Sequence, residues 1–148
     1  MSRRNGHIGS DAKPIRMLHT MLRVGDLERS LSFYIGTLGM RLFRREEYPE
    51  GRFTLAFVGY GQEPTDTLIE LTYNWGRVTY DHGSAYGHIA LATANLNSLC
   101  EMLEACGVKI IRAPGKMTFS SPDRDSDEII AFIEDPDGYR IELIQIPA

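Results

Sequence analysis

Apolar residues in this chain recur with two different spacings, and their alternation predicts the order of its elements. Residues 17–24 are predicted to form an extended strand, because side chains alternate between two faces. One face is mainly aliphatic, and the other carries His19 and Arg23. The apolar positions that follow repeat with helical spacing: Leu27, Leu31, Tyr34 and Leu38. Asp26 before them is a typical N-cap, and Gly39 after them suits the left-handed end of a helix. The pattern predicts one strand followed by one amphipathic helix.

The same order of features occurs twice along the chain. His19 opens the first stretch, HTMLRVGDL, and His88 opens the second, HIALATANL. Each stretch becomes helical after an Asp or Asn and finally closes on an apolar strand with the centre Ile-Glu-Leu, which contains Glu70 in the first copy and Glu142 in the second. A repeat at this scale indicates a duplicated structural unit. One His and one Glu therefore recur in each half of the chain.

Each predicted helix is followed by three more strand-like runs, which completes two modules of the same design. These runs cover 41–45, 53–60 and 67–75 in the first copy, and 109–112, 129–134 and 139–146 in the second. We therefore predict an α+β protein of tandem βαβββ modules, in a single domain over 15–146, with module 1 at about 15–76 and module 2 at about 85–146. Residues 1–14 are predicted to be a disordered N-terminal tail.

Two connections in the second module carry strong turn signals. Residues 113–128 are rich in Pro, Gly, Ser and Asp, which predicts a long exposed loop that is either an ordered lid or disordered. The sequence Asp-Pro-Asp-Gly at 135–138 predicts a tight turn with a structural purpose.

Strand alternation places the repeated His and Glu on the faces that turn away from the helices. In the first module His19 shares a face with Arg23, and Glu70 shares a face with Asn74, whereas Ile69 and its aliphatic neighbours face the helix. His88 and Glu142 occupy the corresponding positions in the second module. If the first and last strands of each module are neighbours in one sheet, each His lies beside the Glu of its own module.

Two neutral imidazoles and two carboxylates are a ligand set that suits a divalent metal ion. Without a cation, two enclosed carboxylates repel each other and lose hydration. A single His or Glu in a strand is more often a surface residue, and the duplicated pairing is what favours a metal site. His7 and His82 have no counterpart in the other module, so we interpret them as surface residues.

Composition narrows the classes of function. The chain has 148 residues, 43% of them hydrophobic, which suits one domain or two small modules sharing a core. Its 16 Lys+Arg and 20 Asp+Glu give a net charge of -4, which argues against a nucleic-acid or anionic-lipid partner. The chain shows neither a run long enough to span a membrane nor the apolar core of a secretory signal near its start, which predicts a cytoplasmic protein. Its two cysteines, Cys100 and Cys106, form neither a disulfide framework nor a zinc knuckle.

At the residues that carry this chemistry, the chain resembles the glyoxalase I family of the vicinal oxygen chelate superfamily. The motifs are MLHTMLRVGDLERSLSFY, FVGYG, LIELTYNWG, AYGHIAL and DPDGYRIELI, and the resemblance covers about residues 16–146. It implies a homodimer of paired modules with two active sites at the subunit interface. His19 and Glu70 match the metal ligands from one subunit, and His88 and Glu142 match those from its partner.

The resemblance also implies an activity, the isomerisation of the hemithioacetal of methylglyoxal and glutathione to S-lactoylglutathione. Glu142 matches the principal base, and Glu70 is placed to serve on the opposite face of the enediolate. Arg23 and Asn74 match positions that hold the glutathione moiety. Zinc-preferring members carry Gln where this chain has His19, so nickel is the favoured metal, with cobalt and zinc left open.

Some features leave alternatives open. The 113–128 loop is longer than in the short bacterial members, and Arg112 and Lys116 are candidates, by charge and place, for binding the substrate's glycine carboxylate. One rival function is another metalloenzyme of the same fold, such as an extradiol dioxygenase or an epimerase. A second rival is a metal-free binding module that sequesters a drug, but that reading predicts at least one broken ligand position.

Overall fold

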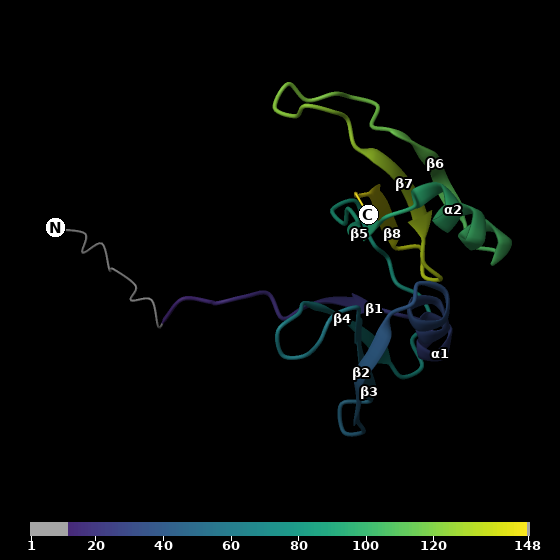
Figure 1. Ribbon diagram of the computed structural model, residues 1–148. Coiled ribbons are helices and arrows are strands. Elements are labelled where there is room, and N and C mark those ends of the chain that lie inside the picture. Colours follow the sequence, from purple (N-terminus) through teal and green to yellow (C-terminus); the bar gives the residue numbers. More distant parts are fainter. Residues whose placement is uncertain (1–11, 148) are drawn as a thin grey trace.

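The chain folds into two separate four-stranded sheets, one from each half, as Figure 1 shows for the computed structural model. The structure describes residues 12–147. Most of the predicted tail at 1–14, and His7 with it, lies outside the described residues. None of the helices within residues 12–147 has the length and apolar character of a membrane span.

Both modules have the predicted βαβββ order. The first contains β1 (His19–Arg23), α1 (Leu27–Leu31), the π-helical turn η2 (Ser32–Thr37), β2 (Arg41–Tyr48), β3 (Phe53–Gly59) and β4 (Leu68–Asn74). The second contains β5 (Ile89–Thr93), α2 (Leu96–Ala105), β6 (Ile110–Lys116), β7 (Ile129–Glu134) and β8 (Arg140–Gln145). The strand orders are β1-β4-β3-β2 and β5-β8-β7-β6, so the duplication extends to topology.

The predicted neighbours are adjacent in both sheets. Strand β1 pairs with β4 in parallel, and β5 pairs with β8 in parallel, while the remaining pairs are antiparallel. Parallel neighbours need a crossover, which the intervening helix and strands supply in each module. The first and last strands of each module therefore lie side by side, as the placement of His beside Glu requires.

Local sequence explains where the helices begin and end. The side chain of Asp26 accepts a hydrogen bond from the backbone N–H of Arg29 at 3.1 Å, and Asn95 caps α2 in the same way. The first helix differs from prediction at its C-terminal end, because the N–H of Leu38 bonds to the carbonyl of Phe33, five residues earlier. Helix α1 therefore widens into a π-helical turn, after which Gly39 adopts a positive φ of 75°.

The loop predicted over 113–128 is shorter in the structure. Strand β6 continues to Lys116, and residues 117–128 form the connection that projects from the upper sheet in Figure 1. Pro114 is tolerated in this strand because β6 is an edge strand and its register shifts between Arg112 and Gly115. The prediction is thus wrong for 113–116.

One apolar core joins the two modules. It includes helix-facing residues of both sheets, such as Leu22, Leu71, Ile141 and Leu143, all of which are buried. The helix-facing sides of the strands are those predicted from alternation. Since both helices share this core, the sheet faces that bear the repeated His and Glu lie on the other side of each sheet.

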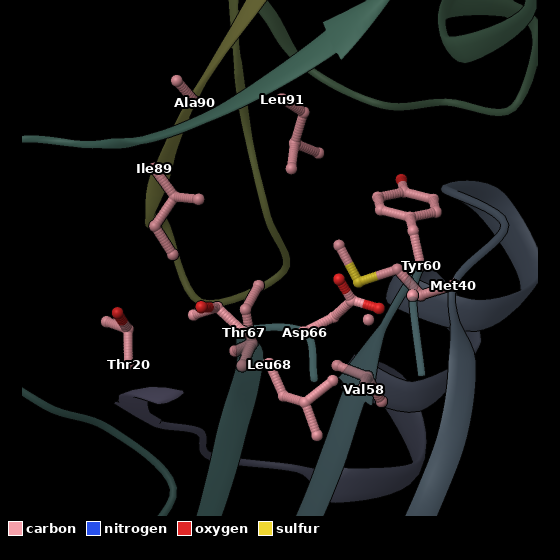
Figure 2. A pocket seen from close by; sticks show the side chains of 13 residues that line it. Thr20, Met40, Val58, Tyr60, Asp66, Thr67, Leu68, Ile89, Ala90 and Leu91 are labelled. Carbon is pink, nitrogen blue, oxygen red and sulfur yellow. The ribbon is translucent and has the colours of Figure 1, made fainter. Parts of the chain in front are cut away.

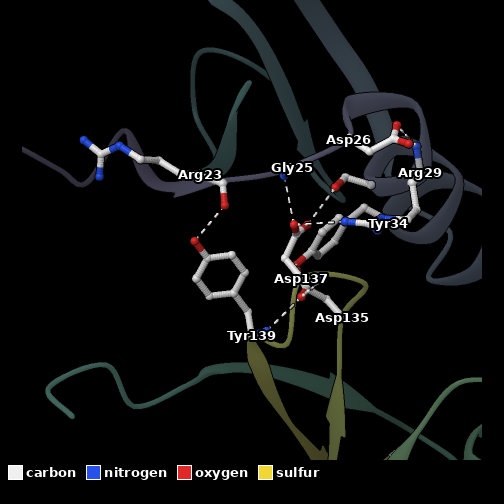
Figure 3. A network of polar contacts seen from close by, with 9 residues as sticks. Arg23, Gly25, Asp26, Arg29, Tyr34, Asp135, Asp137 and Tyr139 are labelled. Carbon is white, nitrogen blue, oxygen red and sulfur yellow. Dashed lines mark hydrogen bonds and ion pairs between the residues drawn. The ribbon is translucent and has the colours of Figure 1, made fainter. Parts of the chain in front are cut away.

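The turn at 135–138 is also the main polar link between the modules, as Figure 3 shows. The hydroxyl of Tyr34 donates to Asp135 at 2.6 Å, and the backbone N–H of Gly25 donates to Asp137 at 2.8 Å. The hydroxyl of Tyr139 donates to the carbonyl of Arg23 at 2.7 Å. The turn predicted from its sequence thus also fixes the end of β1 against the second module.

Asp135 is the centre of this network. Its second oxygen accepts the backbone N–H groups of Asp137 and Tyr139 at 2.9 and 2.8 Å. Burial raises the pKa of Asp135, although the hydrogen bonds that it accepts act in the opposite direction. Burial and the neighbouring Asp135 also raise the pKa of Tyr34, so the phenol stays protonated and donates.

Asp135→Ala should destabilise the protein by about 3 kcal/mol, because it leaves two buried donors and one half-buried donor without their acceptor. For a chain of this size that corresponds to a fall in Tm of roughly 6 to 12 °C, measurable by calorimetry. Asp135→Asn keeps one oxygen for the two backbone N–H groups and should lose much less. Equal losses in the two variants would contradict this account of the network.

Candidate metal centre

Each sheet brings its His and Glu into direct contact. Nε2 of His19 lies 2.6 Å from a carboxylate oxygen of Glu70, and Nε2 of His88 lies 3.5 Å from one of Glu142. The glutamate side chains are only 13% and 14% exposed, whereas the imidazoles are 32% and 41% exposed. Each module therefore presents a sheltered carboxylate beside a more accessible imidazole, in agreement with the predicted pairing.

The strand register explains these contacts. Glu70 is the partner of Met21 in β1, so it lies diagonally beside His19 on the same face. Glu142 is the partner of Ala90, which follows His88 by the same interval. The two pairs thus occupy equivalent positions in their sheets.

Two phenylalanines that the sequence motifs did not indicate occupy equivalent positions in the two sheets. Phe57 pairs with Glu70 and Phe132 pairs with Glu142, and each ring lies edge-on to the histidine of its module, with centroids 5.4 and 5.2 Å apart. The signal was present in the sequence, because an Ala-Phe dipeptide occurs in both β3 and β7. These phenylalanines form an apolar wall against each imidazole.

On the next strand of each sheet, an arginine is the register partner of the phenylalanine. Arg44 pairs with Phe57 and Arg112 pairs with Phe132, and a register shift precedes both arginines. The guanidinium carbon of Arg44 lies 3.7 Å from the centre of the Phe57 ring, and its nitrogens contact Glu46 and Glu63 at 3.0 Å each. Arg44 is thus a second feature of the duplication that the motifs did not identify.

The predicted substrate-binding residues lie at different distances from the paired ligands. Arg23 and Asn74 stand at the ends of the parallel strands β1 and β4, on the face of His19 and Glu70. Asn74 donates to the hydroxyl of Tyr80 at 2.9 Å, and the side chain of Arg23 is exposed. These two residues therefore lie with the first half-site.

Arg112 and Lys116 belong to the second module and lie farther from its ligands. Arg112 is two strands from Glu142 in register, or roughly 10 Å. Its guanidinium donates to the carbonyl of Ile130 at 3.4 Å and to that of Lys116. Lys116 is exposed at the end of β6, where the 117–128 connection begins.

His82 does not lie free on the surface as predicted. It is half-buried, and its ring stacks on Tyr139 with centroids 4.1 Å apart and planes at 8°. Its lack of a counterpart in the other module is consistent with this position beside the Tyr139 link between modules.

A cavity of about 380 Å³ between the modules is separate from the paired ligands. Figure 2 shows Thr20 and Leu68 on one side and Ile89 and Leu91 on the other. None of the four candidate ligands lines this cavity. The cavity is therefore distinct from the candidate metal centre.

The donor set fits a divalent cation, but one chain supplies only pairs. Adjacent ligands at about 2.1 Å from a metal lie about 3 Å from each other, and the two His–Glu distances, 2.6 and 3.5 Å, lie on either side of that spacing. Over residues 12–147, no three His, Cys, Asp or Glu side chains gather closely enough to hold a metal ion. Each module therefore offers one nitrogen and one oxygen donor, which is half of the predicted ligand set.

Comparisons with known proteins agree with this geometry. Residues 16–143 match the model of the Glyoxalase/Bleomycin resistance protein/Dioxygenase superfamily, and the chain belongs to that superfamily. It is 53% identical to a probable lactoylglutathione lyase of Synechocystis over 87% of this chain and 94% of the relative. It is also 53% identical to the lactoylglutathione lyase of Salmonella typhimurium, over 88% and 93% of the two chains. Within the superfamily, these identities place it among the lactoylglutathione lyases, the glyoxalase I enzymes.

Solved structures give the same result for the fold. Glyoxalase I of Zea mays superposes with a TM-score of 0.80 at 43% identity, over 90% of this chain. This chain spans 45% of the length of the maize protein. The trypanothione-dependent glyoxalase I of Leishmania major gives a TM-score of 0.75 at 43% identity, over 89% and 87% of the two chains. The predicted pair of βαβββ modules is therefore confirmed as the glyoxalase fold.

Proposed function

We propose that this protein isomerises the hemithioacetal of methylglyoxal and glutathione to S-lactoylglutathione, with a divalent metal held by His19, Glu70, His88 and Glu142. The observation that carries the proposal is the duplicated His–Glu pair, one on each sheet, in a chain about half identical to lactoylglutathione lyases. The enzyme thereby removes a reactive 2-oxoaldehyde.

We further propose that each active site assembles from two copies of the chain. The first half-site of one copy, His19 and Glu70, faces the second half-site of the other, His88 and Glu142. The absence of any group of three candidate ligands in residues 12–147 supports this arrangement, because one chain alone offers two separate pairs. A homodimer with two equivalent sites satisfies both pairs by symmetry.

The reaction moves protons without a net change in oxidation state. A carboxylate oxygen of Glu142 takes the proton from the carbon that bears sulfur. The electron pair of that C–H bond forms the carbon–carbon double bond of an enediolate, while the π pair of the adjacent carbonyl moves onto its oxygen. The double bond then takes up a proton at the adjacent carbon, and the hydroxyl proton of the first carbon passes to the oxygen on the adjacent carbon. The first carbon thereby becomes the thioester carbonyl, and the adjacent carbon bears the hydroxyl of the lactoyl group. When bound, the cation supplies electrostatic stabilisation of the charge that develops on the two oxygens.

The remaining residues of the site bind and orient the substrate. Arg23 and Asn74 bind the glutathione moiety at the ends of β1 and β4, where both lie on the face of the first half-site. Arg112 and Lys116 offer cations to the glycine carboxylate from the β6 side. Phe57 and Phe132 exclude water from one side of each imidazole.

Nickel is the metal that we propose for the native enzyme, with cobalt and zinc as weaker activators. The set of two imidazoles and two carboxylates has no thiolate, and such a mixed nitrogen and oxygen set does not select zinc. We place the enzyme in the cytoplasm, where glutathione is abundant as the reduced thiol.

Metal reconstitution tests the function. The protein is stripped with a chelator, nickel, cobalt or zinc is added, and thioester formation from methylglyoxal and glutathione is followed by absorbance. We expect negligible activity in the stripped protein, recovery with added metal, and the highest rate with nickel. Absence of thioester with every metal would overturn the proposed reaction, and a highest rate with zinc would overturn the choice of nickel.

A further inference from the structure

The two half-sites have the same register, but their glutamates are held differently. In the first module the hydroxyl of Thr72 donates to Glu70 at 3.3 Å, through the carboxylate oxygen that does not contact His19. Thr72 follows Glu70 by two residues on β4, so both side chains point to the same face, and Thr72 is only 8% exposed. Glu70 is therefore held at both of its oxygens.

The second module has no hydroxyl at the corresponding position. Residue Ile144 follows Glu142 by two residues on β8 and pairs with Ala92, as Thr72 pairs with Arg23 in the first module. An isoleucine side chain has no hydrogen-bond donor. The contact of Glu142 with His88 is also longer, at 3.5 Å against 2.6 Å for the first pair.

The phenylalanines beside the two histidines also differ in their surroundings, and again the first module has more contacts. In the first module Arg44 covers Phe57, which packs edge-on against His19, and two glutamates fix the guanidinium. In the second module the guanidinium of Arg112 is directed to backbone carbonyls of β6 and β7. The duplication therefore preserves the four ligands while the supports around them differ.

We propose that Thr72 is a positioning residue that keeps Glu70 in place as a metal ligand, and that the apolar Ile144 leaves Glu142 as the more mobile carboxylate. This inference rests on the proposed function. A ligating carboxylate is oriented by a hydrogen bond to its other oxygen, whereas a carboxylate that carries a proton during turnover must change its position. The sequence difference between Thr72 and Ile144 thus assigns the two duplicated glutamates to unequal tasks.

Thr72→Val tests the first part, because valine has nearly the same shape and lacks the hydroxyl. We expect nickel to bind about 10-fold more weakly, measured by competition with a chromophoric chelator, and to dissociate faster. At saturating nickel, kcat should remain within about 3-fold of the wild type, because the base is untouched. Thr72→Ser should restore the affinity. Wild-type affinity in Thr72→Val, or no recovery in Thr72→Ser, would overturn the role of Thr72.

Ile144→Thr is the converse test. Ile144→Val is its matched control, because valine has nearly the same size as threonine and lacks the hydroxyl. The added hydroxyl should restrain Glu142, so we expect slower nickel dissociation and a kcat lowered about 10-fold with KM unchanged. Ile144→Val should behave as the wild type. Equal kcat in the two variants would overturn the mobility of Glu142.

These measurements separate the inference from the function on which it rests. If the wild type binds no metal or forms no thioester, the proposed function fails before any variant is compared. If the wild type binds nickel and turns over but the Thr72 and Ile144 variants match their controls, only the unequal tasks are rejected. Thermal unfolding of each stripped variant shows whether a loss comes from the fold.

Discussion

Glu142→Gln should lower kcat by about 1,000-fold, which is within the range that general base catalysis contributes. The amide of glutamine is nearly isosteric with the carboxylate and still has an oxygen to offer to a metal, but it cannot accept the substrate's carbon-bound proton. The variant should therefore retain part of its nickel affinity while turnover is almost lost. Steady-state kinetics at saturating nickel, together with chelator competition, measure the two effects separately.

Glu70→Gln provides the comparison within the same site. Because Thr72 holds the second oxygen of Glu70, replacement of Glu70 should weaken nickel binding more than Glu142→Gln does. Glu101→Gln, which changes an exposed carboxylate on α2, should leave both quantities unchanged. Near wild-type turnover in Glu142→Gln would show that another group takes the proton.

The placement of the four candidate ligands could be predicted from the sequence because it depends on local alternation. A strand has only two faces, so once the helix-facing residues were known, His19 and Glu70 had to lie on the opposite face. The duplication then gave the same answer for His88 and Glu142. Because β1 pairs with β4, and β5 with β8, the His and Glu of each module are also neighbours, with N···O distances of 2.6 and 3.5 Å.

The features that were missed depend on contacts between distant segments. The positions of Arg44 and Arg112 opposite the phenylalanines follow a register shift in each edge pair, which alternation does not reveal. The turn at 135–138 was recognisable from Pro and Gly, but its contacts with Tyr34 and Gly25 require the two modules to pack together. Likewise, the stacking of His82 on Tyr139 has no local pattern in the sequence.

Thr72 shows why alternation alone did not distinguish the two half-sites. Alternation places Thr72 on the same face as Glu70, and Ile144 on the same face as Glu142. It does not indicate that either residue has a role of its own. The hydrogen bond to Glu70 depends on side-chain rotamers, which strand periodicity does not specify. Duplication identifies what the two modules share, and the structure identifies where they differ.

Mixing two inactive variants should restore activity if each site takes one half from each chain. His19→Ala with Glu70→Gln removes the first half-site, and His88→Ala with Glu142→Gln removes the second. Each variant alone should be inactive, since both of its sites contain one broken half. In a mixed dimer, one site combines the two broken halves and the other combines the two intact halves.

Random exchange between equal amounts of the two variants should therefore recover about a quarter of the wild-type activity, because half of the dimers are mixed and each has one intact site. The variants are co-expressed with different affinity tags, and the mixed species is isolated by two successive purifications. That species should bind one nickel per dimer and reach about half of the wild-type kcat per dimer. Remixing two samples of the same variant is the control and should recover nothing. An inactive mixed dimer that is folded and of the correct mass would mean that the halves of a site do not come from different chains, and the proposed assembly of the metal centre would be rejected.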